Sequence, residues 1–152
     1  MNLKECMNVL QKDIHSVVVS MIDEKGHSVS AYLDVMHADE TGIYFLTSNN
    51  GRSLYHHLND SDYISICGKT DGDDFHTKMI NIKGRVRNIG KERIDALINE
   101  NPYMKNLYPD HNLERRKIID VFHVYEGSGT YQEFSIDRPV CETISFTPSK
   151  QS

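Results

Sequence analysis

Cysteine is scarce in this sequence: Cys6, Cys67 and Cys141 are widely separated along its 152 residues. No C-x-x-C pair occurs, which excludes the ligand spacing of a zinc knuckle and the motif of a thioredoxin-type redox protein. An odd number of dispersed thiols is typical of a reducing compartment. We therefore expect a cytoplasmic protein.

Long hydrophobic runs are also missing. No apolar stretch approaches the roughly 20 residues that a membrane-spanning helix needs, so we expect no membrane association. The N-terminal segment MNLKECMNVLQKD does not combine a basic start with an apolar run. We therefore do not interpret it as a secretory signal.

Positive charge is in deficit, because 17 Lys and Arg residues stand against 22 Asp and Glu residues, a formal net charge of −5. Non-specific binding to nucleic-acid phosphates is disfavoured by this total, and we expect no nucleic-acid partner. A local exception is one predicted strand on which Lys83, Arg85 and Arg87 share a face. We interpret it as a solvated strand face; an oligonucleotide-binding barrel is the alternative hypothesis.

Signatures of hydrolytic and metal chemistry are absent. The eight histidines include no H-E-x-x-H motif, and His56 and His57 are adjacent on a predicted helix, so they point in different directions. No G-x-S-x-G motif occurs. We predict no metal site and assign no catalytic residue. Asp34 lies mid-strand and is either a perturbed carboxylate or, as we prefer, a solvent-facing one.

What the sequence does contain is a series of short strand-like runs separated by turns. Gly84 inside a long run predicts a bulge, residues 110–117 are expected to be exposed, and residues 126–129 are predicted to turn a hairpin. The predicted strands are 15–22, 28–36, 42–48, 63–67, 76–88, 118–125 and 129–136. The predicted helices are 2–13, 51–58 and 90–99, with a further helical turn from residue 102.

This pattern predicts a mainly β fold of the α+β type, a small antiparallel barrel of six or seven strands with a few peripheral helices. Hairpin turns dominate, and no β-α-β alternation or internal repeat is visible. We expect a single domain over residues 1–137, followed by an arm or tail over residues 138–152.

The stretch GIYFLTSNNGRSLYHHL, residues 42–58, is the most informative part of the chain. A predicted strand leads into a polar turn, and the turn leads into a predicted helix. Thr47, Ser48, Arg52 and Ser53 would surround the helix N-terminus, where free N–H groups and a bidentate guanidinium favour phosphate. The alternative is that Ser, Asn and Gly serve only as ordinary helix caps.

Three segments together resemble a known family: IYFLTSNNGRSLYHHL, INIKGRVRNIGKERIDALINENP and IIDVFHVYEGSGTYQEFS. Their order over about residues 3–136 is similar to that of FMN-binding split-barrel proteins, above all the pyridoxamine 5′-phosphate oxidase-related branch. The most specific feature is a strand followed by Thr-x-x-x-Gly-Arg and a helix. The resemblance implies a split barrel and a homodimer with FMN at the subunit interface.

The resemblance also implies a set of cofactor-binding residues. The FMN phosphate would be held by Thr47, Ser48, Arg52 and Ser53, next to Leu46 at the end of the strand. In the family, the preceding strand lines the isoalloxazine ring, often through backbone groups. The corresponding positions here are Ser30, Ala31, Tyr32 and Leu33.

The chain departs from the oxidase pattern. True oxidases carry basic residues at the positions that match Ala31, Met36 and Ser53, and a flavin-contacting glutamine at the position of Met79. These departures argue against pyridoxamine phosphate oxidation itself. We therefore predict an FMN-dependent oxidoreductase or reductase that acts on an unknown small molecule, with NAD(P)H as a candidate electron donor. The alternative is a non-catalytic flavin or nucleotide carrier.

Overall fold

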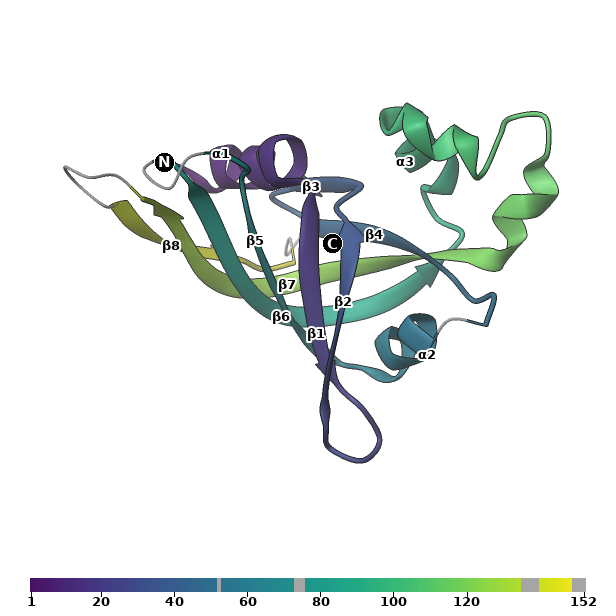
Figure 1. Cartoon of the computed structure of the whole chain (residues 1–152), viewed down its shortest axis with the longest axis horizontal. Helices are drawn as coiled ribbons and strands as arrows, with labels where there is room; N and C mark the ends of the chain where they lie inside the picture. Colours follow the sequence, from purple (N-terminus) through teal and green to yellow (C-terminus); the bar gives the residue numbers. More distant parts are fainter. Residues whose placement is uncertain (52, 73–75, 135–139, 149–152) are drawn as a thin grey trace.

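The structure is a computed structural model, and it describes residues 1–51, 53–72, 76–134 and 140–148. One antiparallel sheet of eight strands forms the centre of this described part, in the order β2-β1-β5-β6-β7-β4-β3, with β8 paired to β7. The sheet is curved and open, and β1 and β2 cross in front of β6 and β7 (Figure 1). This is the split barrel that the sequence predicts.

The elements follow the predicted order. The strands are β1 (Ser16–Ile22), β2 (Ser28–Asp34), β3 (His37–Asp39), β4 (Gly42–Ser48), β5 (Tyr63–Lys69), β6 (Lys78–Gly90), β7 (Ile119–Glu133) and β8 (Val140–Phe146). The helices are α1 (Leu3–Asn8), the π-helix η1 (Val9–Ile14), α2 (Ser53–Asp60), α3 (Ile94–Glu100), and the 3-10 helices η2 (Pro102–Asn106) and η3 (Leu113–Ile118). No helix in the described ranges is long and apolar enough to cross a membrane.

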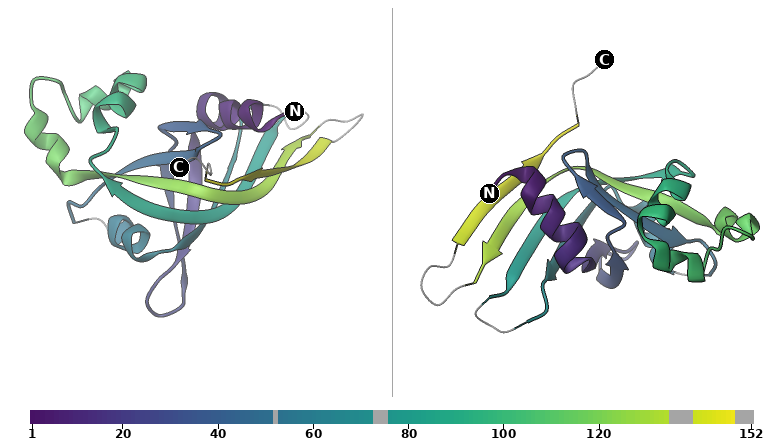
Figure 2. Two further views of the ribbon diagram at one scale, coloured as in Figure 1. Left: turned by 180° about the vertical axis from the view of Figure 1, so that it is seen from behind. Right: turned by 90° about the horizontal axis from the view of Figure 1, so that it is seen from above.

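The N-terminal helix closes the inner face of the curved sheet. Asn2 caps it, because its side chain accepts a hydrogen bond of 2.8 Å from the backbone N–H of Glu5. Met7 and Leu10 have no exposed surface and belong to the main hydrophobic core. Seen from behind and from above, the helix lies across one face of the sheet (Figure 2). The opposite, outer face of β1, β5 and β6 is left open to solvent.

The longest strand, β7, corrects the predicted hairpin. Residues 126–129 do not turn, because β7 continues through them for 15 residues and pairs with β6 along its length. Gly127 and Gly129 serve close packing instead. A Cβ atom at Gly129 would collide with the carbonyl oxygen of Asn81 on β6, and one at Gly127 would lie 2.9 Å from that of Lys83. The predicted bulge near Gly84 is confirmed by a register shift between Arg85 and Val86.

The C-terminal segment also differs from expectation. Residues 140–146, predicted as part of an arm, form strand β8 and pair with the C-terminal half of β7. The N-terminal half of β7 pairs with β4. Strands β4 and β8 therefore follow one another along the same edge of β7, and this part of the predicted arm is integral to the sheet. The boundary at residue 138 stays a prediction.

A second, smaller core forms where β4 and β7 pack against α3, and it includes Tyr44, Leu97 and Val121. The excursion from α3 to η3 lies beyond the end of the barrel (Figure 1). Within it, Arg116 was predicted to be exposed but is only 8% exposed. Its guanidinium donates to Asp95 at 2.6 Å, to Asp110 at 3.0 Å and to the carbonyl of Tyr108 at 2.9 Å. These long-range partners explain why the prediction was wrong.

Candidate functional site

The predicted strand–turn–helix unit is present. Strand β4 ends at Ser48, and the turn is fixed by a 2.8 Å hydrogen bond from the N–H of Asn49 to the carbonyl of Ile118. Gly51 has a φ of 72°, a left-handed conformation that suits glycine. Leu54 and Leu58 are buried in the main core and hold α2 against the barrel. Arg52 lies outside the described residues, and Ser53 is the first residue of α2.

Thr47 carries a hydroxyl whose hydrogen-bonding capacity is not used by the described residues. The alternation of β4 places Thr47 on the same face as Ile43 and Phe45, which belong to the core that also contains Leu54. Thr47 is 3% exposed, and its Oγ1 has no hydrogen-bond partner among the described residues. Such a group costs free energy unless a partner is present. The hydroxyl is therefore a candidate ligand contact beneath the turn.

Leu46 and Ser48 lie on the other face of β4. Leu46 packs in the smaller core against α3, so its side chain is turned away from Thr47. The Ser48 hydroxyl accepts a hydrogen bond of 3.1 Å from the N–H of Asn50. This contact is the ordinary turn-capping role that the sequence analysis kept as the alternative for Ser48.

Strand β2 brings further predicted residues to α2. Among the described strands it pairs only with β1, so it forms an edge of the sheet, and alternate backbone N–H and C=O groups point away from the sheet. Ser30, Ala31 and Ser53 line one cavity of about 290 Å³ between this edge and α2. His57, on the next turn of α2, lines the same cavity. The fold thus gathers predicted residues that are far apart in the sequence.

Tyr32 and Leu33 point in opposite directions from β2. Leu33 is buried in the main core at 7% exposure, whereas Tyr32 is 76% exposed on the outer face. Tyr32 lines a groove of about 650 Å³ that also contains Met79. Tyr32 on β2 and Met79 on β6 are two of the positions that the resemblance associates with the flavin ring. They lie in the same groove.

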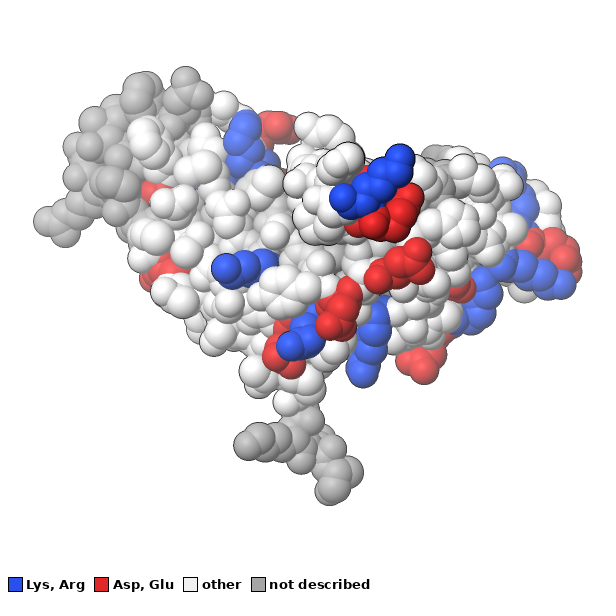
Figure 3. Space-filling view, turned by 90° about the horizontal axis from the view of Figure 1, so that it is seen from below, with Lys and Arg blue, Asp and Glu red and all other residues white. Residues whose placement is uncertain are grey.

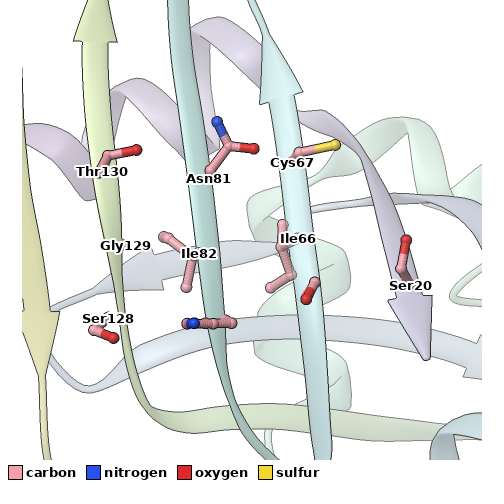
Figure 4. Close-up of a pocket in the computed structure, with 10 residues that line it drawn as sticks. Ser20, Ile66, Cys67, Asn81, Ile82, Ser128, Gly129 and Thr130 are labelled. Carbon is pink, nitrogen blue, oxygen red and sulfur yellow. The ribbon is translucent and has the colours of Figure 1, made fainter. Parts of the chain in front are cut away.

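The outer face of the sheet is built from small, mostly uncharged side chains. The register aligns one row that runs Ser30, Ser20, Ser65, Lys83, Ser128 and Ser145. A cavity of about 350 Å³ lies over the centre of this face, and Figure 4 shows Thr130, Asn81 and Cys67 in one row on its wall. Seen from below, charged side chains are sparse over the left part of the molecule and gather toward the right (Figure 3).

A carboxylate network fixes α2 on its other side. Asp120 on β7 accepts hydrogen bonds from Tyr55 at 2.5 Å and Asn88 at 3.1 Å, and pairs with Lys91 at 3.0 Å. Burial favours a higher pKa for Asp120, but these contacts outweigh burial and lower its pKa. The hydrogen bond to Asp120 is the main reason why the pKa of Tyr55 is raised. Helix α2 is thereby tied to β6 and β7.

A second polar cluster, at the end of the groove that contains Tyr32, was not predicted. Asp34 accepts hydrogen bonds from Ser16 at 2.5 Å and from Tyr103 at 2.7 Å, so it does not simply face solvent as preferred from sequence. The Tyr103 hydroxyl also lies 2.6 Å from Nε2 of His15. Burial, followed by the contact with Asp34, raises the pKa of Tyr103. Ser16 lies on β1 and Tyr103 on η2, so no local motif marks these two partners of Asp34.

The predicted basic face is present, but two of its cations have partners. Arg85 pairs with Asp62 at 3.0 Å and with Glu126 at 3.8 Å. The guanidinium of Arg87 lies 4.6 Å from the centre of the Tyr125 ring. His123 is 8% exposed, and the centre of its ring lies 4.2 Å from that of Tyr44, on which it stacks. Within the described ranges, no group of three or more His, Cys, Asp or Glu residues could hold a metal ion.

No family model matches the sequence, and no curated protein matches it. Solved structures do. A NimC/NimA family protein from Clostridium acetobutylicum has a TM-score of 0.71 at 18% identity, over 95% of this chain and 93% of that one. A pyridoxinephosphate oxidase family protein from the same organism, related to general stress protein 26 of B. subtilis, has a TM-score of 0.57 at 13% identity, over 86% of each chain. HutZ, the heme storage protein from Vibrio cholerae, has a TM-score of 0.57 at 13% identity, over 82% of this chain and 90% of that one.

Identities this low show a common fold and leave the chemistry open, since one fold hosts many functions. The match over nearly the whole of both chains includes the strands that carry the candidate site. The chain therefore has the split-barrel fold of the pyridoxamine phosphate oxidase-like proteins.

Proposed function

We propose that this protein is an FMN-dependent oxidoreductase or reductase that acts on a small molecule. One observation carries the proposal: the cavity between the β2 edge and α2 is lined by Ser30, Ala31 and Ser53 together. These residues were assigned to FMN from the resemblance, on two segments of the chain that are distant in sequence. Their convergence supports one ligand site rather than scattered surface residues.

The polar groups at this site fit a phosphate. The N-terminus of α2 offers backbone N–H groups and a partial positive charge, and Ser53 adds a hydroxyl there. Thr47 supplies a buried hydroxyl that has no partner in the part of the chain that the structure describes, and a phosphate oxygen would satisfy it. In this proposal Thr47 and Ser53 bind the phosphate, and Arg52 adds a cation to the same group.

The ring of the flavin would follow β2. The free edge of this strand offers backbone donors and acceptors for the polar rim of the isoalloxazine, and Tyr32 borders the groove where the ring would continue. Met79 provides an apolar contact there in place of the family's glutamine. Bound FMN would supply hydride transfer, whereas the protein would orient it and exclude water.

A homodimer fits the outer face. Three large apolar side chains on this face are strongly exposed for such positions: Ile22 at 59%, Tyr32 at 76% and Tyr63 at 50%. They flank the row of serines, in which Lys83 is the charged member, and a second copy could cover this row while Arg85 and Arg87 beside it keep their own partners. A partner there would also cover the groove beside β2, which supports FMN binding at the interface between the two copies.

Two conservative substitutions test the phosphate site. We expect Thr47→Val and Ser53→Ala each to weaken FMN binding about 10-fold, because each removes one hydrogen bond worth roughly 1–1.5 kcal/mol. The measurement is a fluorescence titration of FMN with purified protein. Thr130→Val and Ser65→Ala, on the outer face away from α2, are matched controls for general effects on the sheet. Unchanged affinity in both site variants would refute the phosphate assignment.

Turnover separates an enzyme from a carrier. If the proposal is correct, FMN-loaded protein oxidises NADH or NADPH repeatedly when a small electron acceptor is present. A carrier would retain FMN and show no sustained oxidation. The three cysteines are free, as a cytoplasmic protein requires, so the assay needs reducing conditions throughout.

A further inference from the structure

We propose that the groove beside β2 binds a small planar molecule through an O–H or N–H group that donates to the hydroxyl oxygen of Ser16. Asp34, Tyr103 and His15 act as positioning residues for that oxygen. The inference rests on the proposed function only where it identifies this molecule with the substrate. Binding itself requires nothing but the residues of the groove.

The groove combines apolar walls with a polar end. Ile14, Val18, Tyr32 and Met79 give it flat apolar or aromatic surfaces. Ser16 and His15 form part of its wall, whereas Asp34 and Tyr103 are not lining residues and contact Ser16 and His15 through hydrogen bonds. A planar ligand is favoured by these surfaces, and its polar group would meet Ser16.

The direction of the hydrogen bonds decides what Ser16 can recognise. A carboxylate oxygen only accepts, so at 2.5 Å the single proton of Ser16 is committed to Oδ1 of Asp34. The oxygen of Ser16 then presents lone pairs elsewhere, and its hydrogen bond to a charged group makes it a stronger acceptor. Ser16 therefore favours a ligand that brings its own proton.

The charge of Asp34 is balanced by His15 through Tyr103. Tyr103 has one proton, and it is donated to Oδ2 of Asp34 at 2.7 Å. The 2.6 Å contact between Nε2 of His15 and the Tyr103 oxygen must then carry a proton from His15, and Nδ1 faces the carbonyl of Gln11 at 3.2 Å. With Tyr103 donating to Asp34, both ring nitrogens of His15 face acceptors, so the proposal places a proton on each; Nε2 also lies 3.6 Å from Asp34.

The backbone of His15 adopts an energetically unfavourable conformation in this arrangement. Its φ of 63° and ψ of −58° lie in a strained region that non-glycine residues rarely adopt. Two hydrogen bonds hold it: its N–H donates to Leu10 at 2.8 Å, and its carbonyl accepts from Val35 at 2.7 Å. His15, the residue with this strained backbone, is also the residue whose ring contacts Tyr103.

Three further polar side chains line the groove: the ammonium group of Lys69, the amide of Asn81 and the carboxylate of Asp71. Figure 4 shows Asn81 and Cys67 side by side on neighbouring strands, where this groove meets the central cavity of the outer face. The ligand class that fits this lining is a small aromatic or other planar compound that carries a hydroxyl or amino donor for Ser16.

The experiment compares phenol with anisole, which differ only in whether the oxygen carries a proton. Binding to cofactor-free protein is followed by amide chemical shifts in NMR titrations. We expect wild-type protein to bind phenol about 10-fold more tightly than anisole, since Ser16 is solvent-accessible and the lost contact is only partly compensated by water. Ser16→Ala should abolish this preference.

The matched control is Ser20→Ala, on the same face of β1, where the hydroxyl lies 3.0 Å from that of Ser30 and not near Asp34. It should keep the preference for phenol. Equal binding of phenol and anisole to wild-type protein, no binding of either, or a preference that survives in Ser16→Ala would overturn the inference.

A second variant tests the charge balance without changing Ser16. The nitrogen chemical shifts of His15 should show protons on both ring nitrogens in wild-type protein at neutral pH. In Tyr103→Phe, the signal of Nε2 should move toward the neutral form, because its partner is gone; a neutral His15 in wild-type protein would contradict the inference. FMN titration of the same samples keeps the two proposals separate: a preference for phenol without FMN binding sinks only the proposed function.

Discussion

At the scale of single residues, Thr47 links the folded state to the ligand. Its hydroxyl is almost fully buried and has no partner within the described ranges, a desolvation cost that the phosphate of our proposal would remove. Functional groups of this kind tend to lower stability, because they are arranged for a ligand rather than for the fold. Ligand affinity and apo stability should therefore respond in opposite directions to the loss of this hydroxyl.

We expect Thr47→Val to stabilise the ligand-free protein by about 1 kcal/mol, because valine has nearly the same shape, suits a strand and removes the unpaired hydroxyl. Urea unfolding of flavin-free wild type and variant measures the difference. Thr130→Val, at a partly exposed position of β7, should change stability much less. A clear loss of stability in Thr47→Val would mean that the hydroxyl has a partner within the folded chain.

Sequence reasoning predicted the contacts that follow from local order and missed those that depend on distant partners. Thr47 and Ser53 are readable, because a strand, a polar turn and a helix follow one another directly. Asp34 and Arg116 were both predicted to face solvent, since charged residues usually do. Each is instead held by partners far along the chain: Tyr103 in one case and Asp95 in the other. Only the fold brings these groups together.

At the scale of elements, patterns of periodicity predicted which helices and strands exist better than how the strands are connected. The strand–turn–helix unit was predicted within two residues, because alternation, turn residues and helical spacing agree there. The hairpin at residues 126–129 was wrong, since glycines that signal a turn also permit close packing of two strands. Strand β8 was missed because two prolines in the last residues resemble a tail.

His37 belongs to a hydrogen-bonded cluster that connects β3, α3 and the N-terminal helix, and we call this cluster the polar joint. Its Nδ1 lies 2.9 Å from Glu100 on α3, and its Nε2 lies 2.8 Å from Asp39 on the same short strand, β3. Gln11, from the N-terminal helix, donates to Glu100 at 2.6 Å and accepts from the N–H of Ala38 at 3.0 Å. Burial favours higher pKa values for Asp39 and Glu100. Hydrogen bonds with Thr41 and His37 outweigh burial at Asp39, and hydrogen bonds with His37 and Gln11 outweigh burial at Glu100. The pKa values of both carboxyl groups are therefore lowered.

This joint predicts a loss of stability in acid. A carboxyl whose pKa is lowered by folding contributes stability that is fully present above its unfolded pKa, about 4, and that is lost as the pH falls through the folded pKa. We therefore expect the free energy of unfolding to decrease below about pH 4, and His37→Gln to make this decrease smaller. The measurement is urea unfolding across the acid range.

The control for this experiment is His27→Gln, at an exposed position of the β1–β2 hairpin. It should leave the acid dependence as in wild type. At neutral pH, His37→Gln should be the less stable of the two variants, and in strong acid the two should converge. An acid dependence of His37→Gln identical to that of wild type would show that other carboxylates dominate.

At the scale of the whole molecule, the two faces of the sheet have different tasks. The inner face carries the main core and is covered by the N-terminal helix, which fixes the barrel. The outer face carries the serine row, the exposed Tyr32 and Tyr63, and both grooves. Large exposed aromatic side chains beside small uncharged ones are typical of a surface that another protein covers. The proposed cofactor site lies at the border of this face, where β2 forms the edge.

A charge placed in the centre of the outer face should separate the copies of a dimer. Ser65 faces Ser20 and Lys83 across neighbouring strands, so Ser65→Arg would put like charges beside Lys83 and oppose them to the same patch of a second copy. We expect wild-type protein to be a dimer and Ser65→Arg a monomer when molar mass is measured by light scattering after gel filtration. Asn106→Arg, an exposed position beyond the barrel, should remain dimeric. If FMN is shared between copies, Ser65→Arg should also bind FMN more weakly, although Thr47 and Ser53 are intact. A monomeric wild-type protein would reject the interface and confine the flavin to one chain.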